Sequence, residues 1–557
     1  MPMIHNKGRQ MNGYKKIIAT RRKKMNVIAR FEPEIALDPL LKTYSGGLGV
    51  LAGSVARTAK RMNAPLVSVT ILWNRGFYEQ SIGPHGMEIS YPCYDYYKEG
   101  IVEDTGIKVK VQIGENPNVL IKVGLIKPEV FNTVPIITLD SNIPENDDLS
   151  RRNTWVLYPN DTGQRLAQEI ILGIGGVRAL QALKVPVDVY HLNESYTVLA
   201  GIELLNQRIS QGESFIEALE RTKQQIVFTT HTPEITHEAY NIDLMRWMGC
   251  FPNLNKHEIA YLGGDPFNHT VAALRLARKG NAVSKLHAQT VEETLAWVKN
   301  KCPIVGITNG MDAEYWQWIE FKNARTPEEA EKAKLHYKMM LLKYIETQTS
   351  KVLKEDVFTV VWARRFAEYK RPWLLYYDND WFERLLESKE IQIIYAGKPH
   401  PADIGMINVW NNIWKKSKEW QNLVILPGYN LQLSKLLKGG TDLWLNTPRR
   451  PREACGTSWI SAMMNCSLVM STRDGGAIEA IDQDNGFLFG VNSPCLNENE
   501  QDSKDFADLK QSLLLAMDIF YKAKEKWYQM ALAAKKRVIE DFSTEKMLKE
   551  YCLFLYK

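Results

Sequence analysis

Four positively charged side chains fall within eight residues in the second half of the chain. Residues 364–371 read Arg-Arg-Phe-Ala-Glu-Tyr-Lys-Arg and directly follow the apolar segment VFTVVWA at 357–363. Arginine presents a planar fork of donors to phosphate oxygens, and lysine presents a compact point charge. At the carboxyl end of a buried strand, these cations predict a site for a phosphate or diphosphate group. A charged helix start that faces only solvent is the alternative.

A glycine-rich motif lies near the start of the chain. Residues 44–50 read Tyr-Ser-Gly-Gly-Leu-Gly-Val and come shortly after the apolar segment VIARF at 27–31. Glycine lets the backbone turn tightly and approach a ligand closely. If a helix begins here, its free N–H groups favour an anion. A turn with a purely structural role fits the same residues equally well.

A carboxylate and a histidine are the other candidates for chemistry. Glu453 begins the segment Glu-Ala-Cys-Gly-Thr-Ser at 453–458, in which the side chain can bind sugar hydroxyls and the backbone amides can bind a phosphate. His231 closes the apolar segment VFTTH at 227–231. A helix cap at Glu453 and a hydrogen-bonded structural histidine at His231 remain alternatives.

The segments around these motifs alternate between short apolar stretches and stretches with helical spacing, such as residues 161–183. This alternation is typical of parallel sheets with helices on both faces. Ligands of such sheets bind at the carboxyl ends of the strands, so two facing sheets would bring the motifs into one cleft. We therefore predict two α/β domains in tandem. The predicted strands are 27–31, 66–73 and 226–231, then 357–363, 391–397, 423–429, 442–448 and 467–476.

Composition and charge narrow the class of protein. The 557 residues are 45% hydrophobic and 24% charged, as in globular enzymes, and no apolar run is long enough to cross a membrane. The chain carries +6 while residues 1–24 alone carry +8, so the remainder is nearly neutral and no nucleic-acid partner is expected. Seven scattered cysteines without a C-x-x-C pair argue against a disulfide framework and a zinc site. We expect a soluble, cytoplasmic protein without a metal or a membrane partner.

Taken together, the motifs resemble the α-glucan (glycogen/maltodextrin) phosphorylase family, particularly its short bacterial and archaeal branch. The matching segments run in the family's order. They are TYSGGLGVLAG at 43–53, DTGQRLAQEIILGIGGVRAL at 161–180, HLNESY at 191–196, VFTTHTP at 227–233, GITNGM at 306–311, ARRFAEYKRP at 363–372, YAGKPHPAD at 395–403 and WLNTPRRPREACGTS at 444–458.

This resemblance implies the GT-B fold, in which two Rossmann-like domains face each other across a cleft and the C-terminal helices cross back to the first domain. The charge of residues 1–24 predicts a basic, disordered tail or a start upstream of a true Met25. After it we predict an acceptor-side domain at 25–312, a helical linker at 313–354, a phosphate-side domain at 355–525 and returning helices at 526–557.

The resemblance also implies a role for each candidate residue. The glycine loop would lie against the phosphate and the sugar, and Arg365 and Lys370 would hold the substrate phosphate. His231 would contact the glucosyl ring, Asn309 its O6 region, and Glu453 its O3 region. The residues concerned are Gly46, Gly47, Gly49, His231, Asn309, Arg365, Lys370, Glu453, Gly456 and Thr457. Anomeric configuration would be retained.

One departure from the family bears on its cofactor. Family members carry a lysine that forms a Schiff base with pyridoxal phosphate, and Ser461 stands at that position. Because a serine has no amine, we expect no covalent cofactor and do not expect pyridoxal phosphate. Two smaller departures are Tyr196 and Asp312, where the family commonly has histidine.

The departure leaves space that a nucleotide diphosphate occupies in the related GT-B glycogen and starch synthases, where an Arg/Lys pair holds it. The sequence therefore predicts a retaining hexosyltransferase that moves a glucosyl unit from a nucleotide sugar to an α-glucan or another sugar acceptor. One alternative is a phosphorylase that uses a sugar phosphate and holds pyridoxal phosphate without a covalent bond. An inactive glucan-binding protein is another, and a homodimer is left open.

Overall fold

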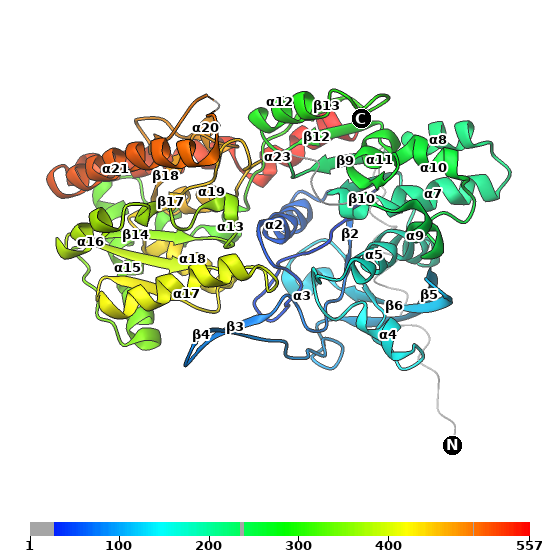
Figure 1. The fold of residues 1–557 in the computed structure, drawn as a ribbon, viewed down its shortest axis with the longest axis horizontal. Coiled ribbons are helices and arrows are strands. Elements are labelled where there is room, and N and C mark those ends of the chain that lie inside the picture. The colour runs from blue at the N-terminus through cyan, green and yellow to red at the C-terminus, as the bar shows by residue number, and fades with distance from the viewer. Residues whose placement is uncertain (1–26, 234–238, 494) are drawn as a thin grey trace, which may run out of the picture.

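Two large parallel sheets organise the chain. The computed structural model describes residues 27–233, 239–493 and 495–557, so the predicted tail at 1–24 lies outside the described residues. In Figure 1 the two sheets stand side by side, with helix α2 (Gly47–Arg61) between them. The predicted α/β class with parallel sheets is confirmed.

Within the described residues, the first half of the chain forms a nine-stranded sheet. Strands β13 to β7 in its order are parallel, and the β5–β6 hairpin extends the β7 edge in antiparallel orientation. Strand β1 and its neighbours β2 and β8 are buried throughout, because helices cover both faces of the sheet, and their sequences are therefore mostly apolar. The order is β13 (Ile304–Gly306), β12 (Lys279–Ala282), β9 (Ile226–Thr230), β8 (Val189–Asn193), β1 (Ile28–Phe31), β2 (Leu66–Ile71), β7 (Ile136–Asp140), β6 (Asn116–Ile126) and β5 (Glu103–Ile113).

The second half forms a sheet that has six strands in the part of the chain that the structure describes, all of them parallel. The predicted strands at 423–429 and 467–476 are shorter than expected, because their last residues form the loops that follow. The order is β16 (Leu423–Leu426), β15 (Ile391–Ala396), β14 (Phe358–Ala363), β17 (Leu443–Asn446), β18 (Leu468–Thr472) and β19 (Phe487–Phe489).

Helices connect the strands of both sheets. The predicted helix at 161–183 is confirmed as α5 (Thr162–Ile170) and α6 (Gly176–Ala182), joined by the π-helical turn Ile171–Gly175. The other helices of the first half are α3 (Pro128–Phe131), α4 (Asp148–Arg152), α7 (Leu199–Ser210), α8 (Phe215–Lys223), α9 (Ile242–Trp247), α10 (Lys256–Gly263), α11 (His269–Leu276) and α12 (Lys285–Thr294). Those of the second half are α13 (Ala313–Trp316), α14 (Ile319–Asn323), α15 (Pro327–Thr349), α16 (Asn379–Glu387), α17 (Ile404–Glu419), α18 (Leu431–Gly440), α19 (Ser458–Met463), α20 (Ala477–Ala480), α21 (Glu498–Lys522), α22 (Lys524–Asp541) and α23 (Thr544–Glu550).

The segment predicted as a linker packs against the second sheet's helices. Helix α15 begins with a capping box, in which Thr326 and Glu329 each bond the other's backbone N–H, and with a proline in its first turn. It packs against α18 and α22. The domain limits themselves stay a prediction.

Several segments of the described residues join the two halves. The hairpin of β3 (Glu79–Gly83) and β4 (Gly86–Ser90) reaches α17, where the Met87 N–H donates to Asn411 at 2.8 Å. Helix α22 packs on α15 and α19, whereas α23 packs on α2. The final π-helical turn, Tyr551–Leu555, packs on β12, and the end of the chain lies beside that strand in Figure 1.

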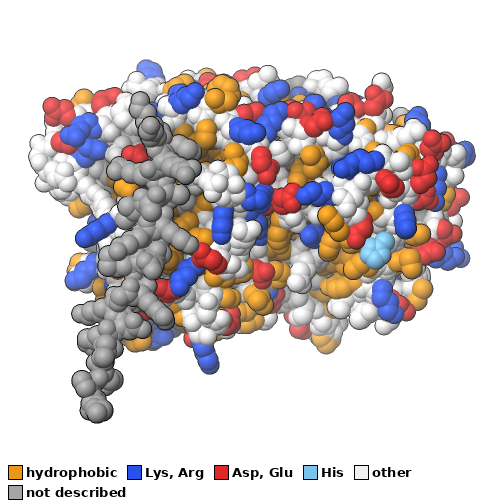
Figure 2. Space-filling model, turned by 180° about the vertical axis from the view of Figure 1, so that it is seen from behind, with side chains coloured by type: hydrophobic (Ala, Val, Ile, Leu, Met, Phe, Trp, Pro, Cys, Tyr) orange, Lys and Arg blue, Asp and Glu red, His pale blue; other side chains and the backbone are white. Residues whose placement is uncertain are grey.

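The molecule's charges are mixed on the face opposite to that of Figure 1. Figure 2 shows Lys and Arg interspersed with Asp and Glu across this face, without a broad area of one sign.

Candidate active site

A cavity of about 410 Å³ is lined by loops that follow strands of both sheets. Nine of the predicted site residues line it, although they come from five separate segments of the chain. They are Gly46, Gly47, His231, Asn309, Arg365, Lys370, Glu453, Gly456 and Thr457. Gly49 and Ser461 are not part of this lining.

The strand ends explain this gathering. Glu34, Glu194 and His231 follow β1, β8 and β9, which are parallel and lie in that order in the first sheet, β1 pairing with β8 and β8 with β9. Arg365 and Glu453 follow β14 and β17, which pair in the second sheet. Parallel neighbours end at the same edge of a sheet, so residues distant in sequence meet there.

Glu453 lies between two cations. Its Oε2 accepts from Lys370 Nζ at 2.6 Å and from Arg364 Nη2 at 3.0 Å, and all three side chains are largely buried. Burial alone would raise the pKa of Glu453, but the charges of Lys370 and Arg364 outweigh it, and the pKa lies below its ordinary value. Glu453 is therefore a fixed carboxylate at neutral pH.

The four cations of residues 364–371 have different surroundings. The side chain of Arg365 is exposed to the cavity, and it forms no ion pair with any residue that the structure describes. Arg371 is fully buried away from the cavity and pairs with Asp502 at 2.8 Å and Asp505 at 2.7 Å on α21. Arg364 donates to Glu453 through Nη2, and its Nε and Nη1 have no hydrogen-bond partner among the residues that the structure describes. Arg364, Arg365 and Lys370 line the cavity, and of these Arg365 and Lys370 are the two with a predicted role in binding phosphate.

The glycine loop is already hydrogen-bonded by a carboxylate. Glu34, which sequence analysis did not single out, accepts from the backbone N–H groups of Ser45 and Gly46. The loop amides expected to be free for an anion are thus partly occupied in this structure. A Cβ on Gly49 would lie 2.7 Å from the Tyr44 Cβ and 2.9 Å from the Glu34 carboxylate, so Gly49 is needed for packing.

His231 is held in place by two neighbours. Its Nε2 lies 2.8 Å from Asn193 Oδ1, and its backbone N–H donates to Glu194 at 2.8 Å. Because the Asn193 amide nitrogen donates to Glu32, the Asn193 oxygen faces His231 and His231 Nε2 carries the proton. Burial lowers the pKa of His231 to about 3, with smaller effects from Arg30 and His287, so the ring is neutral.

Two helix starts face each other across the cavity. A Cβ on Gly47, the first residue of α2, would lie 3.7 Å from Oγ1 of Thr457, which caps α19. Asn309 is buried beside them and donates weakly to the Cys455 carbonyl at 3.5 Å, while its Oδ1 has no partner.

Ser461 does not fit as a cofactor anchor. It is fully buried in α19, and its hydroxyl donates to the Ser458 carbonyl at 3.1 Å in its own helix. The cavity lining instead contains Lys438 of α18, whose Nζ lies 4.0 Å from the centroid of the Trp316 ring. Lys438 was not among the site residues predicted from the sequence, although a lysine inside the largely apolar segment LQLSKLLKGG at 431–440 can indicate a buried amine.

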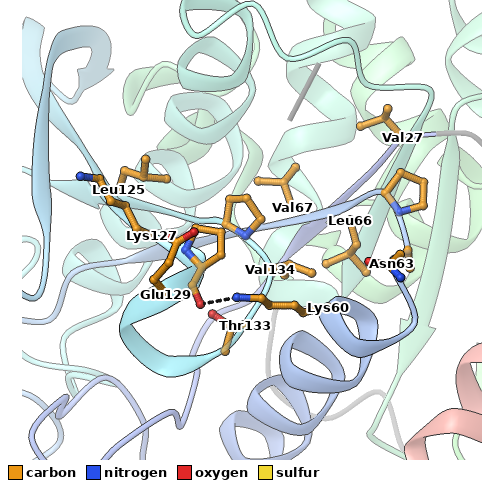
Figure 3. A pocket seen from close by; sticks show the side chains of 14 residues that line it. Val27, Lys60, Asn63, Leu66, Val67, Leu125, Lys127, Glu129, Thr133 and Val134 are labelled. Carbon is orange, nitrogen blue, oxygen red and sulfur yellow. Dashed lines mark hydrogen bonds between the residues drawn. The ribbon is translucent and has the colours of Figure 1, made fainter. Parts of the chain in front are cut away.

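A second cavity in the described residues differs from the candidate active site in its lining. A cavity of about 450 Å³ at the amino ends of β1, β2 and β7 has mostly apolar walls, where Lys60 donates to the Pro128 carbonyl at 2.8 Å (Figure 3). Among the described residues, no cluster of three or more His, Cys, Asp or Glu could hold a metal ion. The helices of that part of the chain are too short or too polar to cross a bilayer.

Comparisons with known proteins identify the family of the chain. The family model for carbohydrate phosphorylases matches residues 319–520. An uncharacterized protein of Methanocaldococcus jannaschii is 40% identical over 96% of this chain and 100% of its own length. The glycogen phosphorylase of Mycobacterium tuberculosis is 30% identical over 95% of this chain and 70% of its own length. The maltodextrin phosphorylase of Thermococcus litoralis is 29% identical, with 93% and 69% covered. The chain belongs to the carbohydrate phosphorylase family.

Proposed function

We propose that this chain is a retaining phosphorylase that moves a glucosyl unit between an α-glucan and inorganic phosphate, in a GT-B arrangement of its two halves. The observation that carries the proposal is the gathering of nine predicted site residues from both halves around one cavity. The names of the phosphorylase relatives support sugar phosphate chemistry over a nucleotide sugar.

The cations would bind the phosphate. Arg365 faces the cavity without an ion pair among the described residues, so its guanidinium is available to phosphate oxygens. Lys370 is paired with Glu453, so phosphate would have to share or displace that contact. Fixed cations beside the departing or attacking phosphate stabilise the charge that develops on it in the transition state.

The opposite wall would bind the sugar. His231 donates from Nε2 to Asn193, which leaves Nδ1 as an acceptor for a sugar hydroxyl. The unpartnered Oδ1 of Asn309 is a second acceptor, and Glu453 is a third. Hydrogen bonds from several directions fix the ring relative to the phosphate, which is the positioning that glycosyl transfer requires.

Pyridoxal phosphate, which the family implies, would be held by Lys438 rather than Ser461. When bound, it would supply a second phosphate group that can exchange a proton with the substrate phosphate. A cytoplasmic location and a homodimer remain predictions.

The nucleotide-sugar donor is kept as a second candidate on one observation, the buried serine at the expected lysine position. A donor screen separates the two. The protein is incubated with maltodextrin and either phosphate, glucose 1-phosphate, UDP-glucose, ADP-glucose or GDP-glucose, and chain lengths are read by mass spectrometry.

We expect shortening with phosphate and extension with glucose 1-phosphate. Extension by a nucleotide sugar, without either of those changes, would favour the second candidate. Glucan binding without any change in chain length would favour the inactive binding protein. The Arg365→Ala variant is the negative control for each reaction.

A further inference from the structure

Lys438 differs from the other buried lysines that the structure describes. Each of the others is satisfied: Lys370 pairs with Glu453, Lys338 with Asp442, and Lys334 and Lys535 donate to backbone carbonyls. Lys438 is 3% exposed, yet its ammonium has no hydrogen bond or ion pair within the described residues. A buried amine without an acceptor is costly, so its retention points to a partner that binds it.

The surroundings of this amine are aromatic. Its Nζ lies 4.0 Å from the centroid of the Trp316 ring and 5.6 Å from that of Trp444. Such contacts stabilise a cation only in part, and they exclude water from the amine. Burial lowers the pKa of Lys438 to about 7, so a large share of the side chain is the neutral, nucleophilic amine at neutral pH.

The residue also borders the proposed active site. Lys438 lines the same cavity as Arg365, Glu453 and Gly47. Helix α18, which carries it, packs against α19, which carries Ser461. Two further polar atoms of the lining, Ser458 Oγ and Asn309 Oδ1, are buried without partners, so this part of the cavity offers bonds to a polar ligand.

We infer that Lys438 is the covalent anchor for a phosphorylated aromatic aldehyde of the pyridoxal phosphate class, moved to a neighbouring helix from the position that Ser461 occupies. Nζ of Lys438 bonds to the aldehyde carbon, and the carbonyl oxygen leaves as water, so the step needs no oxidant or reductant. The product is an imine in the cavity that also contains the phosphate-binding cations. This inference rests on the proposed phosphate chemistry of the same site, but its test does not use turnover.

The test is labelling followed by reduction. The purified full chain is mixed with less than one equivalent of pyridoxal 5′-phosphate, reduced with borohydride, digested and mapped by mass spectrometry. At pH 7.5 the neutral fraction of an amine with a pKa near 7 is several hundred times that of an ordinary lysine, so we expect labelling of Lys438 to exceed that of any surface lysine by at least about tenfold. An imine absorbance should appear before reduction.

Two variants control the labelling. Lys438→Arg keeps a cation but cannot form the imine, and should lose both the absorbance and the label. Lys435→Arg alters a more accessible lysine of α18, which lies over the Trp318 ring and outside the cavity lining, and should keep both. Thermal unfolding of each variant reports whether it is folded, and a Lys438→Met variant repeats the test if the arginine does not fit.

Labelling spread evenly over surface lysines, or retained in Lys438→Arg, would overturn the inference. A phosphate-dependent reaction without labelling at Lys438 would remove the anchor and leave the proposed function intact. Labelling at Lys438 without any reaction of phosphate would support the anchor and contradict the proposed function.

Discussion

Lys370 Nζ lies 2.6 Å from a carboxylate oxygen of Glu453, although the two residues are 83 positions apart. The family resemblance implies a phosphate role for Lys370 and a sugar role for Glu453. In the proposed site, their contact would give the phosphate and sugar subsites a shared wall, and a bound phosphate would compete with Glu453 for the same ammonium. This relationship gives the first of four predictions.

Substituting Lys370→Gln should lower kcat/KM for phosphate by roughly 10²- to 10³-fold, because it removes a fixed charge from the developing anion. Glucan binding should persist, since Arg364 still holds Glu453. Initial rates of phosphorolysis at varied phosphate give the number. Lys435→Gln is the matched control, and equal rates in both variants would remove Lys370 from the phosphate site.

The two adjacent arginines should behave differently. Arg365→Leu should abolish turnover but change the free energy of unfolding by no more than about 0.5 kcal/mol, because the side chain is exposed and forms no described ion pair. Arg364→Leu should cost about 1–3 kcal/mol, because a buried charge-assisted bond to Glu453 is lost. Urea unfolding measures both. A stability loss at Arg365 as large as that at Arg364 would contradict this division.

Gly46 and Gly49 of the glycine loop differ in the space available for a side chain. Gly49→Ala should destabilise the protein by about 1–3 kcal/mol, because the new Cβ would lie 2.7 Å from Tyr44 Cβ. Gly46→Ala should leave stability unchanged, since its Cβ would meet no atom within 4 Å and its φ of −154° suits any residue. Thermal unfolding compares the two. Equal losses would mean that the loop's packing differs from that described.

Acidification should destabilise the protein partly through His231. Its pKa is lowered to about 3 in the folded chain, first by burial. Between about pH 6.5 and pH 3 the unfolded chain binds a proton that the folded chain does not, so stability falls as the pH falls through this range. His191, His269 and His287 act in the same direction, and His231→Asn should therefore reduce the slope without abolishing it.

Unfolding by urea at pH 7.5 and pH 5.0 gives that slope. A single group can contribute at most about 1.4 kcal/mol per pH unit. An unchanged slope in His231→Asn would mean that the histidine is solvated in the folded chain.

The class of fold could be predicted from local patterns in the sequence. Strands such as β14 and β15 are buried on both faces of a parallel sheet, so their sequences are mostly apolar and could be predicted as strands without a structure. The β5–β6 hairpin was not predicted, because it lies at the edge of the sheet and much of its surface is exposed. The segments of the candidate site could also be found, since cations and glycines stood at strand ends.

Contacts between distant segments could not be read in this way. Arg364, Lys370 and Arg371 have similar sequence surroundings, yet Arg364 and Lys370 bond Glu453 at the cavity, whereas Arg371 pairs with α21. Glu34 reaches the glycine loop, and Lys438 reaches the cavity, only through the packing of α2 and α18. Periodicity along a chain reports which side chains are buried, because burial depends on one element's own faces. Which buried side chains meet depends on how separate elements pack together, and that information is not local to any segment.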